Sequence, residues 1–248
     1  MHVSLRCIFS LLVALGSFVI VNSDDRDSRS PSRCTFEDIF VSRSGYEVDI
    51  FSAQRCKTID LSGEKIGELG IAELSKCSLA HLEVFDLTRN KLGENGGSYL
   101  STILKNASKL TSLAVWGNYL NPRGAMHIIN ALNSSALTHL YMGGNNIQNT
   151  GAQMLADVLA SGSKLEVLHL NGNNIDDTGV VDLADALSRN SRLKELDLQW
   201  NHLGERGSAA LVTSLLQNTV METVLLGGPE PFKRDVEMCS QNRGMCVI

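Results

Sequence analysis

A short motif of leucine and asparagine returns along this chain at an almost constant step, and this period restricts the fold more than any other feature. Its clearest copy, LEVLHLNGNNIDDTGVVDLADAL, runs from Leu165 to Leu187. The leucine-rich part ends at an asparagine that recurs every 27 or 28 residues. The recurring asparagines are Asn90, Asn118, Asn145, Asn173 and Asn201. A step of this size indicates a stack of similar units, because one such unit cannot bury its own apolar residues.

Two further positions of the motif repeat without exception. A glycine always stands six residues after the asparagine position, and an aliphatic residue stands ten residues after it. The asparagine position holds Glu64 in the first unit and Pro229 after the last. The glycines are Gly70, Gly96, Gly124, Gly151, Gly179 and Gly207, and the aliphatic residues are Leu74, Leu100, Ile128, Leu155, Leu183 and Leu211. We therefore expect six units and a closing strand.

The spacing of the leucines predicts one strand and one helix in each unit. Leu168 and Leu170 are two residues apart, which places them on one face of a strand. Leu183 and Leu187 are four residues apart, which places them on one stripe of a helix. Strands joined by a helix pair in parallel. The asparagine amide can satisfy backbone groups at the end of the strand, and the repeated glycine suits a positive φ or close packing.

This frame resembles the leucine-rich repeat of the ribonuclease-inhibitor type, which also forms the repeat regions of NOD-like receptors and of the Ran GTPase activator. The resemblance extends from Cys56 to Pro229. It implies an α/β solenoid, a curved horseshoe with parallel strands on its concave face and helices on its convex face. It implies less about function, because function depends on the residues that a fold displays.

The start of the chain predicts a secretory signal peptide in residues 1–23. Arg6 precedes an apolar run from Ile8 to Val21, and a polar segment follows Ser23. The run of about 14 residues is shorter than the roughly 20 that a membrane-spanning helix needs, and an uncleaved anchor is the alternative. Residues 24–33 are charged and rich in serine, which predicts a disordered leader. We expect a protein that is secreted or lumenal, with no membrane span once the signal is removed.

The rest of the chain should form one domain. Residues 34–55 do not fit the repeat and are rich in aromatic side chains, and the exposed apolar end of a solenoid needs a cap. We assign residues 34–55 to an N-terminal cap, residues 56–226 to six repeats and a closing strand, and residues 227–248 to a C-terminal cap or tail.

Five cysteines follow the predicted signal peptide, and a secretory route favours disulfide bonds between them. They are Cys34, Cys56, Cys77, Cys239 and Cys246. Cys239 and Cys246 could clip the tail, and Cys34 could tie the cap to Cys56 or to Cys77. Because five is an odd number, one thiol should stay unpaired.

Two N-glycosylation sequons stand at equivalent places in neighbouring units, where a helix ends and the next strand begins. They begin at Asn106 and Asn133. We expect the loops to face outward and both asparagines to carry glycans.

Strand positions that the core does not need should face the concave side, and their residues suggest a ligand-binding surface. The aromatic and histidine positions are Trp116, His139, Tyr141 and His169 on adjacent units, with Trp200 further along. Tryptophan and tyrosine often dominate binding energy at protein interfaces. The acidic positions that flank them are Asp60, Asp86, Glu195 and Asp197, and no lysine or arginine occupies the three columns. We expect Asp86 and Asp197 to act as exposed rim charges that orient a protein or peptide partner with basic groups.

The sequence argues against catalysis, cofactors and nucleic acid. The mature chain has 21 Lys and Arg against 27 Asp and Glu, whereas nucleic-acid binders carry a basic patch. No glycine-rich nucleotide-binding motif is present. His139 and His169 fall in different columns without further ligands, so no metal site is expected. Ser112, His139 and Asp86 lack the strained elbow and oxyanion hole of a hydrolytic triad.

Non-catalytic recognition of a protein or peptide by the concave face is therefore the predicted function. Two alternatives come from the resemblance: an inhibitor or regulator of an enzyme, as ribonuclease inhibitor is, and a GTPase activator. Both kinds of relative are cytosolic, so the predicted signal peptide argues against them.

Overall fold

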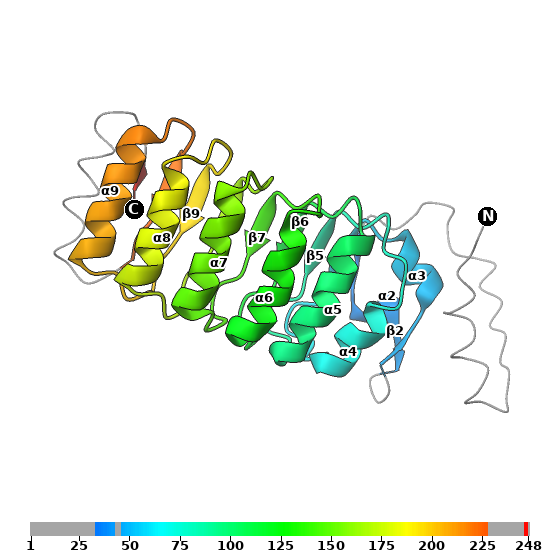
Figure 1. The fold of residues 1–248 in the computed structure, drawn as a ribbon. Coiled ribbons are helices and arrows are strands. Elements are labelled where there is room, and N and C mark those ends of the chain that lie inside the picture. The colour runs from blue at the N-terminus through cyan, green and yellow to red at the C-terminus, as the bar shows by residue number, and fades with distance from the viewer. Residues whose placement is uncertain (1–32, 43–45, 228–245, 248) are drawn as a thin grey trace, which may run out of the picture.

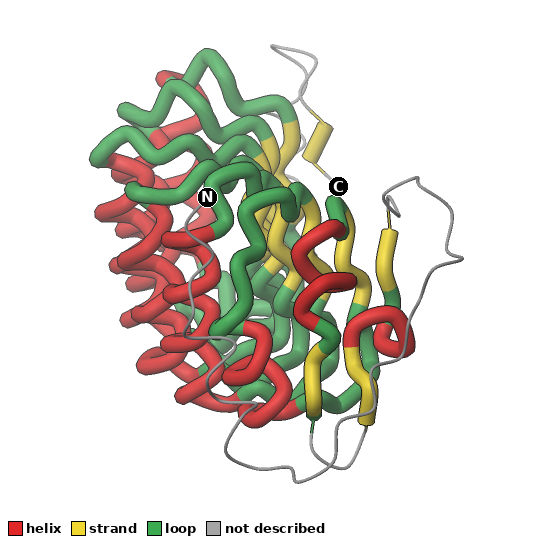
Figure 2. The backbone as a smooth tube through the Cα atoms, turned by 90° about the vertical axis from the view of Figure 1, so that its right-hand side faces the viewer, coloured by secondary structure: helices red, strands yellow, loops and turns green. Residues whose placement is uncertain are grey.

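The computed structural model describes residues 33–42, 46–227 and 246–247. In these residues each repeat contributes one short strand and one helix to a single row (Figure 1). Helices α4 to α9 lie side by side on one face of the sheet (Figures 1 and 2). The predicted signal peptide and all of the predicted leader except Arg33 lie outside the described residues, as does most of the predicted C-terminal tail.

The main sheet is parallel throughout, and its strands follow the order of the chain. Its strands are β1 (Arg33–Cys34), β4 (Thr58–Asp60), β5 (Val84–Asp86), β6 (Ser112–Ala114), β7 (His139–Tyr141), β8 (Val167–His169), β9 (Glu195–Asp197), β10 (Thr223–Leu225) and β11 (Cys246–Val247). A separate antiparallel pair consists of β2 (Phe40–Ser42) and β3 (Glu47–Val48). The sheet thus begins at Arg33, one residue before the predicted start of the cap.

The helices fall into two sets. The short ones near the N-terminal end are α2 (Phe36–Ile39) and α3 (Ile50–Arg55). The helices of the repeats are α4 (Gly67–Leu74), α5 (Gly93–Asn106), α6 (Asn121–Leu132), α7 (Gln148–Ala160), α8 (Asp177–Leu187) and α9 (Glu205–Gln217). Among the described residues, no helix is long and apolar enough to cross a membrane.

Neighbouring strands pair in register with the period of the sequence. Tyr141 of β7 lies opposite Ala114 of β6 and His169 of β8. His139 lies opposite Ser112 and Val167 in the adjacent column. The predicted α/β solenoid with parallel strands and the predicted columns are therefore confirmed.

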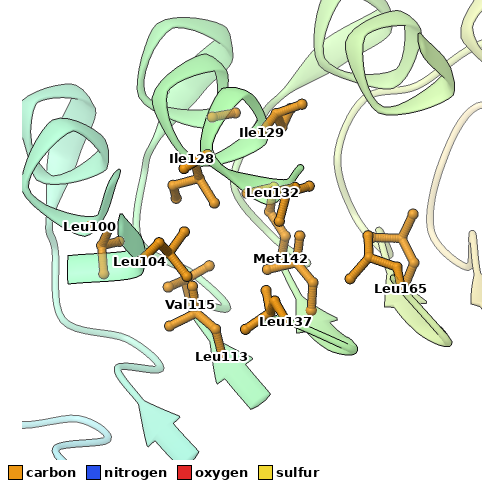
Figure 3. Close-up of a cluster of buried hydrophobic side chains, with 14 of the residues drawn as sticks. Leu100, Leu104, Leu113, Val115, Ile128, Ile129, Leu132, Leu137, Met142 and Leu165 are labelled. Atoms are coloured by element: carbon orange, nitrogen blue, oxygen red, sulfur yellow. The ribbon is translucent and has the colours of Figure 1, made fainter. Parts of the chain in front are cut away.

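The core lies between the sheet and the helices, where the leucines of the motif meet. Leu168, Leu170, Leu183 and Leu187 are fully buried. Figure 3 shows how side chains of successive units pack against one another, such as Leu104 of α5 near Val115. Each buried aliphatic side chain stabilises the fold by about 1.5–3 kcal/mol, and most of that burial requires a neighbouring unit.

The repeated glycines serve close packing rather than a left-handed backbone. A β-carbon at Gly151 would lie 2.7 Å from Cβ of Ile147, and one at Gly179 would lie 2.8 Å from Cγ2 of Ile175. In each case the glycine makes room for the side chain that precedes it by one helical turn.

A disulfide bond joins Cys34 to Cys56 and so ties β1 to the end of α3. This is one of the two pairings that the sequence left open for Cys34. Cys77 is buried, and its Sγ lies 3.8 Å from the carbonyl oxygen of Glu73. Cys239 lies outside the described residues, and the side chain of Cys246 is not described.

The N-terminal segment covers the first repeat with aromatic side chains. The rings of Phe36 and Phe40 stack with centroids 4.7 Å apart, and Tyr46 meets Phe40 edge-on at 5.8 Å. The hydroxyl of Tyr46 donates a hydrogen bond to the backbone oxygen of Lys65 in the first repeat. Residues 34–55 thus contact the repeat that would otherwise expose its apolar side.

Candidate functional site

The sheet surface opposite helices α4 to α9, which we call the strand face, corresponds to the predicted concave face. Side chains alternate along a strand, so residues on either side of a buried leucine point to this surface. Tyr141, His139 and His169 are each partly buried, whereas Leu140 and Leu168 between them are fully buried. The strand face can therefore vary in sequence without loss of the core.

Tyr141, His169 and Glu195 form one cluster on three adjacent strands. The rings of Tyr141 and His169 meet edge-on with centroids 4.8 Å apart. Nε2 of His169 lies 2.7 Å from Oε1 of Glu195. Burial raises the pKa of the Tyr141 hydroxyl, and the charge of Glu195 raises it further. The hydroxyl therefore stays protonated and available as a hydrogen-bond donor at neutral pH.

His139 lies beside this cluster without joining it. Its Nδ1 is 2.8 Å from Oγ1 of Thr138, the residue that precedes it. The two histidines thus have different partners, Thr138 and Glu195. In the described part of the chain, no three His, Cys, Asp or Glu residues stand close enough to hold a metal ion.

Trp116 lies against the backbone of the next repeat. A β-carbon at Gly143 would be 2.5 Å from Cδ1 of the indole, and one at Gly144 would be 3.3 Å from Cε2. The Cζ atom of Arg89 lies 4.8 Å from the indole centroid on the side of the preceding repeat. The indole is thus held between a guanidinium group and a pair of glycines. Trp116 lies one strand and two residues away from Tyr141, which is about 8 Å between Cα atoms at ordinary sheet spacing.

Arg89 is a residue of this surface that the strand columns alone did not indicate. It stands in the turn after β5, three residues beyond the last strand residue, Asp86. The sequence could have indicated Arg89, because the equivalent turn position is glycine in four other units. Those glycines are Gly63, Gly117, Gly144 and Gly172.

The acidic residues at the N-terminal end of the strand face already have partners within the chain. Asp60 accepts a hydrogen bond from the amide of Ser62 at 3.0 Å and forms an ion pair with Arg33. Burial alone would raise the pKa of Asp60, but the bonds from Ser62 and Arg33 lower it overall. Asp86 accepts a hydrogen bond from the amide of Thr88 at 2.8 Å.

Asp197 does not fit the predicted exposed rim. Its side chain is buried, with the residue only 7% exposed, and it accepts a hydrogen bond from the amide of Gln199 at 2.8 Å. Burial raises its pKa, although the Gln199 bond and the charge of His169 oppose that rise. The prediction of a solvent-facing charge here is wrong, because the residue is buried and its carboxylate is directed to a backbone amide of its own unit. Glu195 is engaged by His169.

Trp200 lies apart from the other aromatic residues. It is 80% exposed and stands in the turn after β9, three strands from Trp116, or about 14 Å along the sheet. The structure therefore places Trp116 and Tyr141 on neighbouring repeats and Trp200 at a separate point on the turn side of the sheet.

The predicted glycosylation positions lie at helix ends. Asn106 is the last residue of α5, and Asn133 directly follows α6. Both are exposed, and Nδ2 of Asn133 lies 3.3 Å from Oγ of Ser161. Their use stays a prediction.

Comparisons with known proteins agree on the repeat. A family model described as leucine-rich repeat matches residues 78–101, 133–156, 163–184 and 189–212. No curated protein sequence matches the chain.

Two solved structures show the same fold. One is the leucine-rich repeat-containing protein LegL7 from Legionella pneumophila, with 19% identity and a TM-score of 0.55 over 78% of this chain and 63% of LegL7. The other is actin-binding site 2 of leiomodin-1, with 18% identity and a TM-score of 0.50 over 58% of this chain and 87% of that one. This chain thus spans less than two thirds of LegL7. The register, the buried leucines and these similarities show that the chain has the leucine-rich repeat fold.

Proposed function

We propose that this protein is a non-catalytic recognition module that binds a protein or peptide through its strand face. The observation that carries the proposal is the fixed position of Trp116, held between Arg89 and the glycines of the next repeat. A large aromatic side chain that is already ordered loses little entropy on binding. Such residues are often central anchors of interfaces.

The surroundings of Trp116 support this proposal. Tyr141 keeps a protonated hydroxyl at the surface, and its ring is fixed against His169. The repeat itself needs neither side chain, since the same columns hold Ala114 and Gly143 in neighbouring units. The segment of leiomodin-1 with this fold is described as binding actin, which agrees with a protein as the class of ligand.

We also propose that the chain is secreted after cleavage near Ser23. The Cys34–Cys56 disulfide supports an oxidising compartment, because such bonds rarely persist in the cytosol. The same bond argues against a cytosolic inhibitor or GTPase activator. N-terminal sequencing of the protein from culture medium tests the cleavage, and an N-terminus at Met1 would contradict it. Removal of N-glycans should lower the mass in two steps if Asn106 and Asn133 are both modified.

Affinity capture with matched variants tests the binding proposal. Wild-type protein and a Trp116→Ala, Tyr141→Ala double variant serve as parallel baits in extracellular fluid, and mass spectrometry identifies proteins that only the wild type retains. With the purified partner, each single variant should cost about 2 kcal/mol or more, roughly a 30-fold rise in Kd. Trp200→Ala tests whether the exposed indole in the turn after β9 belongs to the same site. Equal affinity of all variants would move the site to another surface.

A further inference from the structure

The turns at the carboxyl ends of the strands contain several residues with a positive φ, and at one turn position two units carry a large side chain where the others have glycine. The residue before each recurring asparagine, or before Glu64 in the first unit, has a positive φ, and in four of these six units it is glycine. Arg89 and Trp200 occupy this position in the other two units, with φ of 57° and 59°. A β-carbon clashes with the backbone in this region, so glycine would fit better. Lys91 and Tyr119, in the same turns, have a similar φ, so the departure from glycine at this position, rather than the strain alone, is the reason to look for a function of the side chain.

The side chain of Arg89 extends onto the next repeat. Its Cγ would be 3.4 Å from a β-carbon at Gly117, and its Cζ lies 4.8 Å from the centroid of Trp116. Trp116 in turn lies over Gly143 and Gly144. The guanidinium, the indole and the glycine backbone therefore contact one another in series across three repeats, and the lack of a β-carbon at Gly143 leaves room for the indole.

Stacking leaves the guanidinium able to bind a carboxylate. A guanidinium on an aromatic face keeps its N–H donors in its own plane, where they can meet two carboxylate oxygens at once. Arg89 is exposed, and no carboxylate of the described residues forms an ion pair with it. Asp86 of the same unit directs its carboxylate to the amide of Thr88 instead.

The other charged residues near Arg89 also favour a negatively charged partner. Lys91 is exposed two residues after Arg89, and it too forms no ion pair within the part of the chain that the structure describes. The strand-face acids, in contrast, accept bonds from Arg33, Ser62, Thr88, His169 and Gln199. Arg89 and Lys91 are therefore cations near Trp116 that no carboxylate of the described residues pairs with, whereas Asp86 keeps its charge but directs one oxygen to a backbone amide.

We propose that Arg89 is a carboxylate-binding residue of the strand face and that the ligand is an extended acidic segment of a protein. An aspartate or glutamate of that segment pairs with the guanidinium in bidentate geometry, and a neighbouring apolar residue packs on Trp116. This inference rests on the proposed function and reverses the basic partner that the sequence suggested.

The inference can be tested with a random library of displayed twelve-residue peptides, from which those that bind the full chain are selected. Selected peptides should be enriched in Asp and Glu, and Arg89→Gly should weaken their binding at least tenfold. The same substitution should raise the urea midpoint of unfolding because it relieves the backbone strain. Loss of binding could then not result from loss of folding. Arg89→Lys keeps the charge and removes the planar donor pair, so it should also weaken binding.

Arg123→Ala is the matched control, because it removes an exposed cation at the start of α6 and should leave binding unchanged. Selection of basic peptides would overturn the inference and leave the proposed function standing. The same holds if the selected peptides lose affinity for Trp116→Ala but not for Arg89→Gly. Peptides indifferent to Trp116→Ala and Tyr141→Ala would overturn both, as would a library without binders. Displacement of acidic peptides by an equal concentration of single-stranded DNA would show a general polyanion site and also overturn the inference.

Discussion

Replacing Asn173 with alanine tests how strongly the asparagine ladder holds one repeat to the next. Asn173 is fully buried. Its Oδ1 accepts hydrogen bonds from the amides of Asn145 at 2.9 Å and Ile147 at 3.3 Å. Its Nδ2 donates to the carbonyl oxygens of Met142 at 3.0 Å and Leu170 at 2.9 Å. One side chain thus satisfies backbone groups of its own repeat and of the preceding one.

The cost of the substitution falls mainly on the two amides. The carbonyl of Met142 also accepts a bond from Asn145, and the carbonyl of Leu170 accepts one from Asn201. Both carbonyls therefore keep a partner in Asn173→Ala. The amides of Asn145 and Ile147 lose the acceptor described above. A buried donor without a partner costs about 1–3 kcal/mol, and the 3.3 Å bond is the weaker of the two, so we expect about 2–4 kcal/mol in total.

Two matched variants calibrate this value in urea unfolding. Asn201 makes the equivalent bonds to the amides of Asn173 at 2.9 Å and Ile175 at 3.0 Å, but it is only partly buried. Water can replace its amide, so Asn201→Ala should cost less than Asn173→Ala. Asn174 is exposed, bonds to Oδ1 of Asn146 and has a φ of 56°, a conformation that alanine tolerates less well than asparagine, so Asn174→Ala should cost about 1 kcal/mol. If Asn173→Ala is no more destabilising than Asn174→Ala, the ladder does not hold the repeats together.

Three further predictions follow from single contacts. Oδ1 of Asp177 accepts hydrogen bonds from the amides of Gly204 and Gly207 at the start of α9, at 2.7 and 2.9 Å. Asp177→Ala should lower the free energy of unfolding in urea by about 0.5–2 kcal/mol. No change would mean that water caps the helix equally well. A β-carbon at Gly97 would lie 2.1 Å from the carbonyl oxygen of Gly124. Gly97→Ala should therefore lower the free energy of unfolding by about 1–3 kcal/mol. An unchanged free energy would show that α5 and α6 can move apart at no cost. Burial raises the pKa of Asp197 above its ordinary 3.8, so its ionised form destabilises the fold. Asp197→Asn should therefore be more stable than wild type at pH 7, and the difference in urea midpoint between the two should shrink as the pH falls through the raised pKa and become constant below 3.8. A difference that does not change with pH would contradict this.

The residues that build the stack could be predicted because each one repeats. Leu168 and Asn173 have the same kind of neighbours as their equivalents in adjacent units, so the period predicts these contacts. The nearly constant step of 27 or 28 residues between units also fixes the register, which is why Tyr141 could be placed opposite His169. The strand columns followed from the sequence for this reason.

The side chains that occur once could be placed only in part. Nothing in the period shows that Asp197 is covered by its neighbours or that Cys34 pairs with Cys56 rather than Cys77. Arg33 lies just outside the predicted cap, yet it joins the sheet and neutralises Asp60. These outcomes depend on the direction of individual side chains and on the packing of non-repeating segments.

Departures from the repeat are more informative about function than the repeat itself. At the left-handed turn position glycine would suffice for the fold, yet Arg89 and Trp200 stand there. The contact with Trp116 offsets part of the strain at Arg89, whereas the indole of Trp200 is 80% exposed and gains little from the fold. Strands β5 and β9 are four spacings apart, about 19 Å in a parallel sheet. A partner segment that contacts both residues therefore needs about six extended residues, a length that a twelve-residue displayed peptide exceeds.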